Sequence, residues 1–139
     1  QIVNVIVDTS VWSLLLRRNT VEKNNVYVKA LRYYLENQYC VHLPGIVLQE
    51  ILDGIKTAKQ FDLLNDYFEA FPLITMERKD FIEAARLKNK CRSKGIQAGS
   101  IDFLIAAIAI NRNYPLLSAD KDFQYIAAHC SLTLAKTDN

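Results

Sequence analysis

Short apolar runs alternate along the chain with longer segments of helical spacing. The first run, residues 2–7 (IVNVIV), has Asn4 as its one polar residue. Such a run is typical of a strand covered on both faces in a parallel sheet. Similar runs, bounded by turn or polar residues, follow at 40–43, 72–75, 115–118 and 131–134. This alternation predicts an α/β fold with three layers: a mostly parallel central sheet of about five strands, flanked by helices.

The segments between the runs are predicted to be helices. In the segment from residue 79 to 94, Phe81, Ala84, Ala85 and Leu87 mark one face, and Gly95 is a left-handed stop. No internal repeat or interdomain linker is found, so we expect a single domain over residues 1–139. The predicted helices cover residues 10–17, 22–37, 46–56, 61–71, 79–94, 101–113 and 122–128.

Composition restricts the class of protein. Half of the 139 residues are hydrophobic, with only 4 Gly and 3 Pro, which favours a compact globular chain. The formal charge is +2, from 17 basic and 15 acidic residues. This charge is too small for a protein that coats nucleic acid by bulk electrostatics, so any contact with nucleic acid must be local.

The cysteines and the lengths of the apolar segments indicate the cellular compartment of the protein. Cys40, Cys91 and Cys130 are odd in number and far apart, which argues against a disulfide framework or a structural zinc site. No apolar segment reaches 18 residues, and the opening residues lack the features of a secretory signal. We therefore expect a cytoplasmic protein with no membrane span.

Two aspartates follow predicted strands. Asp8 comes directly after residues 2–7, and Asp120 lies just past residues 115–118. Open parallel sheets place their ligand crevices at the carboxyl ends of strands. The alternative for Asp8 is a helix N-cap, and phosphoacceptor domains and haloacid-dehalogenase-like phosphatases also carry an Asp there. One of Asp120 and Asp122 is expected to cap the last helix, with Asp122 as the first candidate.

Two further acids lie on predicted helices. Glu50 is in the first two turns of the helix over 46–56, with Asp53 on the same face; a solvated face is the alternative. Asp53, beside Gly54, is expected to serve the helix end or a turn. Asp102 lies in the first turn of a helix whose next residues, 103–110, are all apolar, which predicts a position at the lip of the core. Its alternative role is to stabilise the helix dipole.

A cluster of Asp8, Glu50, Asp102 and Asp120 has strong electrostatic consequences. Two unit charges about 4 Å apart repel by about 4 kcal/mol at an effective dielectric near 20, so the cluster must bind protons, basic side chains or a cation. Carboxylates without imidazole or thiolate partners favour Mg²⁺ or Mn²⁺ over zinc, and His42 and His129, in no metal spacing, are expected to be structural. Such a site suits phosphodiester hydrolysis, because the metal activates water and no protein nucleophile is required.

The chain resembles a known family at four places: VDTSVW after the first strand, LQEIL, GSIDFLIAAIA and LLSADKDFQYI. These look like the acidic signatures of PIN domains, and in this arrangement like VapC-type toxin ribonucleases of toxin–antitoxin pairs. The resemblance implies a PIN-like fold and an endoribonuclease dependent on Mg²⁺ or Mn²⁺. It implies the catalytic and metal-binding carboxylates Asp8, Glu50, Asp102 and Asp120, the auxiliary ligand Asp122, and the supporting hydroxyls Thr9, Ser10 and Ser118.

The resemblance also implies partners: an RNA substrate, a VapB-like antitoxin docked in a groove near the site, and a homodimer. Candidate groove residues, which at helical spacing also suit a core, are Trp12, Tyr33, Tyr34, Tyr67 and Phe68. Candidate phosphate contacts, each also explicable as a solvated charge, are Arg17, Arg18, Lys56, Lys59 and Lys121. The alternative from another class is a noncatalytic binding module with the same fold. A phosphoacceptor is disfavoured because strand one has no second early Asp.

Overall fold

The sheet at the centre of the molecule is parallel. The computed structural model describes residues 2–17 and 24–137. Within those residues, four strands form one sheet in the order β3-β2-β1-β4, and every neighbouring pair runs parallel. The strands are β1 (Val3–Val7), β2 (Tyr39–Pro44), β3 (Leu73–Ile74) and β4 (Leu116–Leu117).

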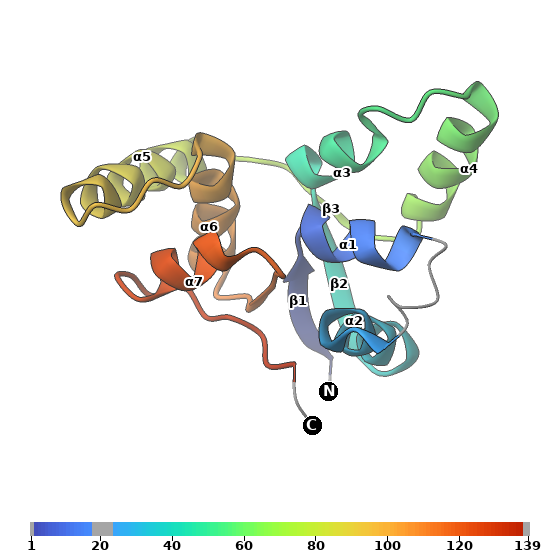
Figure 1. The fold of residues 1–139 in the computed structure, drawn as a ribbon, viewed down its shortest axis with the longest axis horizontal. Coiled ribbons are helices and arrows are strands. Elements are labelled where there is room, and N and C mark those ends of the chain that lie inside the picture. Colours follow the sequence, from blue (N-terminus) through green and yellow to red (C-terminus); the bar gives the residue numbers. More distant parts are fainter. Residues whose placement is uncertain (1, 18–23, 138–139) are drawn as a thin grey trace.

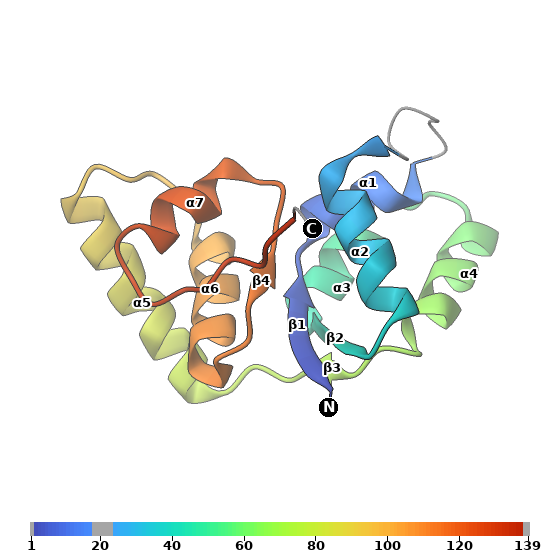
Figure 2. The ribbon, with the colours of Figure 1, turned by 90° about the horizontal axis from the view of Figure 1, so that it is seen from below.

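Helices cover both faces of this sheet, which confirms the three-layer α/β prediction. Helices α1 to α4 lie on one side and α5 to α7 on the other (Figures 1 and 2). Among the described residues, no helix is both long enough and apolar enough to cross a lipid bilayer. The helices are α1 (Thr9–Leu16), α2 (Val26–Glu36), α3 (Gly45–Leu52), α4 (Ala58–Phe68), α5 (Arg78–Ser93), α6 (Ser100–Arg112) and α7 (Lys121–Ala127).

The prediction of about five strands was wrong, because the run at 131–134 forms only an isolated parallel bridge between Leu134 and Leu116. Two backbone hydrogen bonds make this bridge: Leu116 donates to Thr133, and Ala135 donates to Leu116. β4 is only two residues long, since the chain turns away at Ser118 to meet Asp8. The segment at 131–134 therefore has too short a neighbouring strand to extend its pairing beyond one bridge.

The helix boundaries follow local capping. α3 ends at Leu52, before the expected residue 56, because Gly54 adopts a left-handed φ of 86°. Asp53 is its C-cap, as expected. α4 begins three residues earlier than predicted, since the Thr57 hydroxyl accepts a hydrogen bond from the Gln60 amide at 3.2 Å.

Two other helix ends depend on Asn25 and Gly95. The Asn25 side chain accepts a hydrogen bond from the Tyr27 amide at 2.8 Å, so α2 begins at Val26. The predicted start at residue 22 lies outside the described residues. Gly95 has a φ of 81° just after α5, which confirms the predicted left-handed stop.

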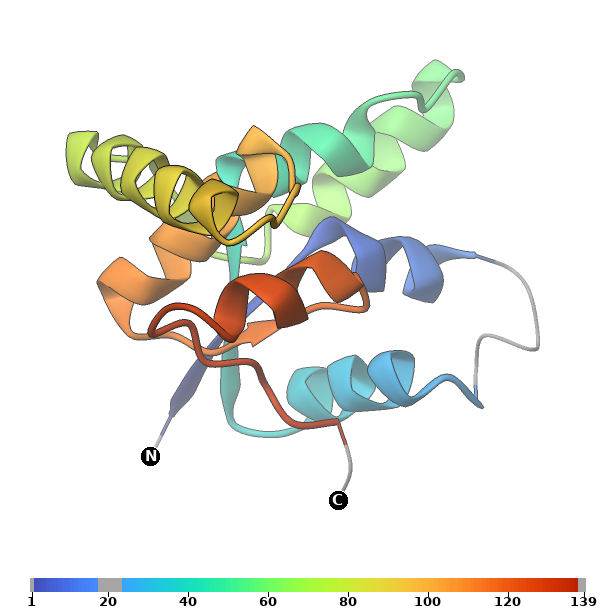
Figure 3. The same ribbon diagram turned by 60° about the vertical axis from the view of Figure 1, so that its left-hand side comes forward.

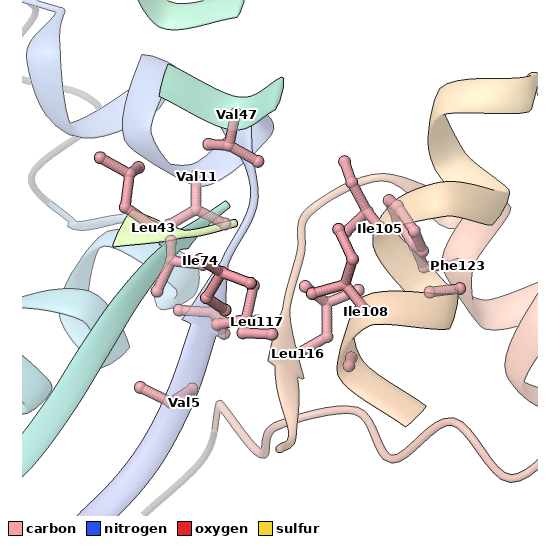
Figure 4. Packing of buried hydrophobic residues seen from close by; sticks show 14 of the residues in the cluster. Val5, Val11, Leu43, Val47, Ile74, Ile105, Ile108, Leu116, Leu117 and Phe123 are labelled. Atoms are coloured by element: carbon pink, nitrogen blue, oxygen red, sulfur yellow. The ribbon is translucent and has the colours of Figure 1, made fainter. Parts of the chain in front are cut away.

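The apolar core joins the two helical layers to the sheet. Figure 4 shows Val11 and Val47, from α1 and α3, on one side of the strands, and Ile105 and Ile108 of α6 on the other. From Phe103 to Ile110, α6 is buried or half-buried throughout, as its apolar sequence predicted. A helix this well covered holds its first turn, and therefore Asp102, in a fixed position.

The buried side of α5 differs in part from the predicted one: Leu87 is buried as expected and Ala84 is half-buried, but Ala85 is exposed. Phe81 is 52% exposed, whereas Asp80 is fully buried. The Asp80 carboxylate accepts hydrogen bonds from both terminal nitrogens of Arg112, at 2.9 and 3.0 Å, and from Asn111 at 2.9 Å. Burial raises the pKa of Asp80, but hydrogen bonds from Arg112, the Glu77 amide and Asn111 outweigh it and lower the pKa to about 2. An ion pair between α5 and α6 thus takes the place that an apolar side chain was expected to fill.

Candidate functional site

Asp8 and Ser118 lie side by side at the carboxyl edge of the sheet. β1 and β4 are neighbours, and the backbone amide of Asp8 continues their pairing by donating to Leu117 at 3.1 Å. The residues that follow the two strands therefore meet, although 110 positions separate them in sequence. This is the edge at which ligands bind in open parallel sheets.

Two serine hydroxyls hold the Asp8 carboxylate. Ser10 donates to Oδ1 at 2.6 Å, and Ser118 donates to Oδ2 at 2.8 Å. The same hydroxyls accept backbone bonds at 3.0 Å: Ser10 from Ala119, and Ser118 from Asp120. Asp8 occupies the N-cap position of α1, but its side chain makes no capping hydrogen bond. Its oxygens accept instead from Ser10 of α1 and from Ser118 across the sheet edge.

The pKa of Asp8 is raised from 3.8 to about 6. Burial is the main cause, since Asp8 is only 4% exposed, and the negative charge of Asp120 raises the pKa further. Hydrogen bonds from Ser10 and Ser118 act in the opposite direction, as does the backbone amide of Val11. Asp8 and Asp120 are therefore close enough to interact electrostatically.

Glu50 joins the site from α3. Its Oε1 accepts a hydrogen bond from the Thr9 hydroxyl at 2.7 Å, which links α3 to the first turn of α1. Glu50 is half-buried, as expected for a side chain bordering the core. Asp53, the expected i+3 neighbour, is exposed at the helix end and takes no part in this contact.

The starts of α6 and α7 bring three further carboxylates together. Asp102, Asp120 and Asp122 each offer an oxygen, and these atoms lie within 4.8 Å of one another. The Asp102 carboxylate also accepts a 3.3 Å hydrogen bond from the Gly99 amide. Both helices direct their positive ends toward these charges, which favours anions there.

Burial is the first cause of the raised pKa of Asp102. The Gly99 amide lowers this pKa, whereas the charges of Asp120, Asp122 and Glu50 raise it. Asp102 is thus within electrostatic reach of all three acids. Together with the electrostatic interaction of Asp8 with Asp120, this brings all five predicted acids to one edge of the sheet.

The expected capping role of Asp122 was wrong. Asp120 is the N-cap of α7, and its Oδ1 accepts a hydrogen bond from the Asp122 amide at 2.9 Å. Asp122 lies in the first helical turn, where its carboxylate is free of the capping task and faces Asp102 and Asp120. The strand ends earlier than the sequence suggested, so the helix also begins earlier.

A divalent cation fits the three clustered aspartates. Carboxylate oxygens are the ligands that hard cations such as Mg²⁺ and Mn²⁺ prefer. One oxygen from each of the three aspartates lies within 4.8 Å of the others, so these residues could hold one such ion. Asp8 and Glu50 are outside this group of three but interact electrostatically with it, Asp8 with Asp120 and Glu50 with Asp102. Their carboxylates are therefore placed to influence what binds beside the group.

The aromatic and basic candidates divide between core and surface. Trp12, Tyr34 and Phe68 are buried in the core, whereas Tyr33 and Tyr67 are 45% and 44% exposed. The basic candidates Arg17, Lys56, Lys59 and Lys121 are exposed, and Arg18 lies outside the described residues.

Sequence reasoning missed one polar contact near the site. The Lys88 ammonium donates to the Ser100 hydroxyl at 2.7 Å, two residues before Asp102. This contact ties α5 to the first turn of α6. The sequence signal was a lysine beside the apolar face of α5, directly after Leu87.

Known structures with this fold include two complexes. The crystal structure of VapBC2 from Rickettsia felis, bound to a DNA fragment from its promoter, matches with a TM-score of 0.74 and 21% identity, covering 97% of this chain and 99% of that one. VapBC-1 from nontypeable Haemophilus influenzae matches with a TM-score of 0.75 and 17% identity, covering 95% and 96%. At 21% and 17% sequence identity, these matches show a shared fold and nothing further.

Sequence comparison identifies the family. Ribonuclease VapC1 of Methanocaldococcus jannaschii is 29% identical over 76 residues, which cover 55% of this chain and 56% of that protein. The match thus spans little more than half the length of that relative. The family model described as PIN domain matches residues 5–129, nearly the whole chain. With its parallel sheet and its acids at the carboxyl edge, this chain belongs to the PIN-domain family.

Proposed function

We propose that this protein is an endoribonuclease that depends on Mg²⁺ or Mn²⁺ and acts as the toxin of a toxin–antitoxin module. One observation carries the catalytic part: in a chain of the PIN family, oxygens of Asp102, Asp120 and Asp122 lie within 4.8 Å of one another at the carboxyl edge of a parallel sheet. The family match over residues 5–129 also supports treating residues 1–139 as a single domain.

The clustered carboxylates are the proposed cation ligands. Asp102, Asp120 and Asp122 hold the ion directly, and Asp8 and Glu50 complete its surroundings. When bound, such an ion activates water and stabilises charge on the phosphoryl oxygens. Asp8 is kept in one orientation by Ser10 and Ser118, and Glu50 by Thr9, so each carboxylate is positioned before substrate arrives.

The protein groups also determine where protons reside. Five neighbouring acids repel one another, and the pKa of Asp8, raised to about 6 mainly by burial, shows where a proton is retained most readily. Binding of a cation next to Asp8 would lower this pKa, so proton binding at Asp8 and cation binding should compete. Its place beside Asp120 puts this competition next to the proposed ligands.

RNA is the proposed substrate because the curated relative is named a ribonuclease. Exposed cations follow the acidic segments along the chain, among them Arg17, Lys56, Lys59 and Lys121. Such side chains can contact RNA phosphates without distinguishing the base sequence. A few cations of this kind agree with the expectation, from the small net charge, that any contact with nucleic acid is local. The proposed setting is the cytoplasm.

The proposed partners are a VapB-like antitoxin and a second copy of the chain. Support comes from solved structures of the same fold, whose names describe VapBC complexes. In this proposal the antitoxin silences the ribonuclease, and the toxin works as a homodimer.

Asp102→Asn tests the catalytic proposal. Asn preserves the size of the side chain, so we expect the fold to persist while RNA cleavage falls by orders of magnitude. The matched control is Asp62→Asn, an exposed acid on α4 away from the site. Sequencing the 5′ ends of cellular RNA after induction of each variant identifies new cuts. Cleavage at the wild-type level by Asp102→Asn, or in excess chelator, contradicts the assignment and favours a noncatalytic binding module.

Growth tests the toxin proposal separately. Expression of the chain alone should arrest growth, and coexpression with the adjacent small open reading frame should restore it. Asp102→Asn should be harmless in the same host, which ties toxicity to cleavage. A wild-type chain that cleaves RNA in vitro yet leaves growth unaffected contradicts the toxin role only.

A further inference from the structure

A small cavity lies directly beside the acidic cluster. Its volume is about 220 Å³, and its lining includes Asp120 and Ser118 at one end. The rest of the lining comes from α2, β4, α7 and the chain after residue 133, and includes Tyr27, Phe123, Gln124, Lys136 and Thr137. Because Asp120 belongs to both, the cavity and the proposed cation site are neighbours.

The topology brings these segments to the carboxyl edge. The bridge between Leu134 and Leu116 is parallel, so the residues after Leu134 extend to the same edge as those after β4. Figure 3 shows the last described segment, in dark red, running between α7 and α2. Tyr27 is in the first turn of α2, the end opposite the turn into β2.

Hydrogen bonds hold the wall formed by the last segment. The Ala135 amide donates to Leu116 at 2.8 Å, and the Tyr34 hydroxyl donates to the Lys136 carbonyl at 3.3 Å. One bond fixes the segment to β4 and the other to α2. The side chains of Lys136 and Thr137 are therefore presented from a backbone anchored on both sides.

The lining carries the groups that recognise an unpaired nucleotide. Phe123, which is 1% exposed, adds an apolar side chain to the lining. Tyr27 adds a half-buried aromatic ring, and Gln124 an exposed amide that both donates and accepts. Lys136 adds a cation. Single-stranded RNA is recognised by such means: bases stack on aromatic rings, amides read base edges and cations contact phosphates.

We propose that this cavity binds the nucleotide next to the scissile phosphodiester and so sets the base preference of cleavage. The inference rests on the proposed ribonuclease function and adds a recognition site to it. Tyr27 stacks on the base, Gln124 reads its edge, and Lys136 contacts its phosphate. Because Asp120 lines the cavity and also belongs to the acidic cluster, the phosphodiester that adjoins a bound nucleotide would lie beside the proposed cation ligands.

Binding of mononucleotides tests the cavity without any cleavage. Each of the four 5′-mononucleotides is titrated into the whole protein in chelator, and backbone amide shifts are followed by NMR. We expect saturable shifts at Gln124, Lys136 and Thr137, with one base preferred. Tyr27→Ala should weaken binding about tenfold through lost stacking. Gln124→Ala, at an exposed position that leaves the fold intact, should weaken it about fivefold and reduce the preference.

Tyr125→Ala is the matched control, because Tyr125 is 54% exposed on α7, beside Gln124 but outside the cavity. Its binding should equal that of the wild type. Absence of shifts at the lining residues overturns the proposal, as does equal weakening by Tyr125→Ala. Tyr27→Phe keeps the ring and should bind as the wild type does if stacking is the interaction.

Cleavage separates this inference from the function on which it rests. On RNA, Tyr27→Ala and Gln124→Ala should raise KM more than they lower kcat, and should change the base preferred at one position beside the cut. If the wild type cleaves and both variants keep its base preference, the recognition site is overturned and the ribonuclease stands. If the wild type cleaves no RNA, the ribonuclease proposal fails, and the mononucleotide titration alone decides whether the cavity binds a nucleotide.

Discussion

The Ser118 hydroxyl donates a 2.8 Å hydrogen bond to Asp8 Oδ2, joining the ends of β4 and β1. Ser118 also accepts from the Asp120 amide at 3.0 Å. A single hydroxyl thus fixes the Asp8 carboxylate and the backbone of a proposed ligand at once. The geometry of the site depends on this serine as much as on the acids.

Ser118→Ala should raise the pKa of Asp8 above about 6, because a hydrogen bond to the charged form lowers a pKa and this variant removes one. The loss should also destabilise the protein by about 1–3 kcal/mol, since the partners of the hydroxyl are left unsatisfied. NMR titration of the Asp8 carboxyl carbon measures the shift. Ser93→Ala, which removes a hydroxyl bonded to the Lys90 carbonyl, is the control and should leave Asp8 unchanged.

Asp120 has two separable tasks, as N-cap of α7 and as proposed ligand. Asp120→Asn keeps a capping oxygen, so stability should stay near that of the wild type while Mn²⁺ affinity falls. Asp120→Ala should lose about 1 kcal/mol more, because the cap is also removed. Urea unfolding and calorimetric titration of Mn²⁺ measure the two effects. Equal stability of the two variants contradicts the capping role.

The metal-free protein should become less stable as pH rises from about 4 to above 6. The folded pKa of Asp8 is raised, so its protonated form stabilises the fold at low pH, and that contribution is lost as pH rises through about 6. The shift from 3.8 to about 6 corresponds to about 3 kcal/mol. Urea unfolding in chelator, from pH 4 to pH 7.5, measures this loss.

Mn²⁺ should reverse that loss at pH 7.5. At about 100 times its dissociation constant, the cation should add roughly 2.7 kcal/mol to the free energy of unfolding. Asp102→Asn should reduce both the pH slope and the Mn²⁺ effect, because it removes one of the repelling charges and one proposed ligand. A wild-type protein indifferent to Mn²⁺ at pH 7.5 is the result that rules out a shared cation site.

The buried pair of Asp80 and Arg112 should stabilise the packing of α5 on α6. Arg112→Met leaves the fully buried Asp80 without its cation, and should cost about 3–5 kcal/mol. Lys79→Met, which removes a mostly exposed partner 3.9 Å from Glu77, should cost less than about 1 kcal/mol. Urea unfolding at pH 7 compares the two variants. Similar losses in both contradict the role given to the buried pair.

The pH dependence of this pair has the opposite sign to that of Asp8. The folded pKa of Asp80 is lowered to about 2, so its contribution is present above 3.8 and is lost as pH falls through about 2. The loss should reach about 2 kcal/mol in the wild type. It should shrink or reverse in Arg112→Met, because only the Glu77 amide and Asn111 then oppose the effect of burial on the pKa of Asp80. An undiminished acid slope in that variant assigns the effect to other carboxyls.

The sequence by itself determined the elements and the order of the acids along them. The continuous apolar run of β1 indicated a strand covered on both faces, and the apolar run after Asp102 indicated a buried helix. Such signals are local, because periodicity and caps act within a few residues. They placed Asp8 and Asp102 at a strand end and a helix start before any contact was known.

Tertiary structure decided the contacts and the exceptions. The sequence does not show that Arg112, 32 positions away, would let Asp80 replace Phe81 on the buried side of α5. Nor does it show that the turn of β4 toward Asp8 would make Asp120 the cap and leave the run at 131–134 as an isolated bridge. Each outcome depends on partners distant in sequence, whose hydrogen bonds and charges outweigh local preference once the chain is packed.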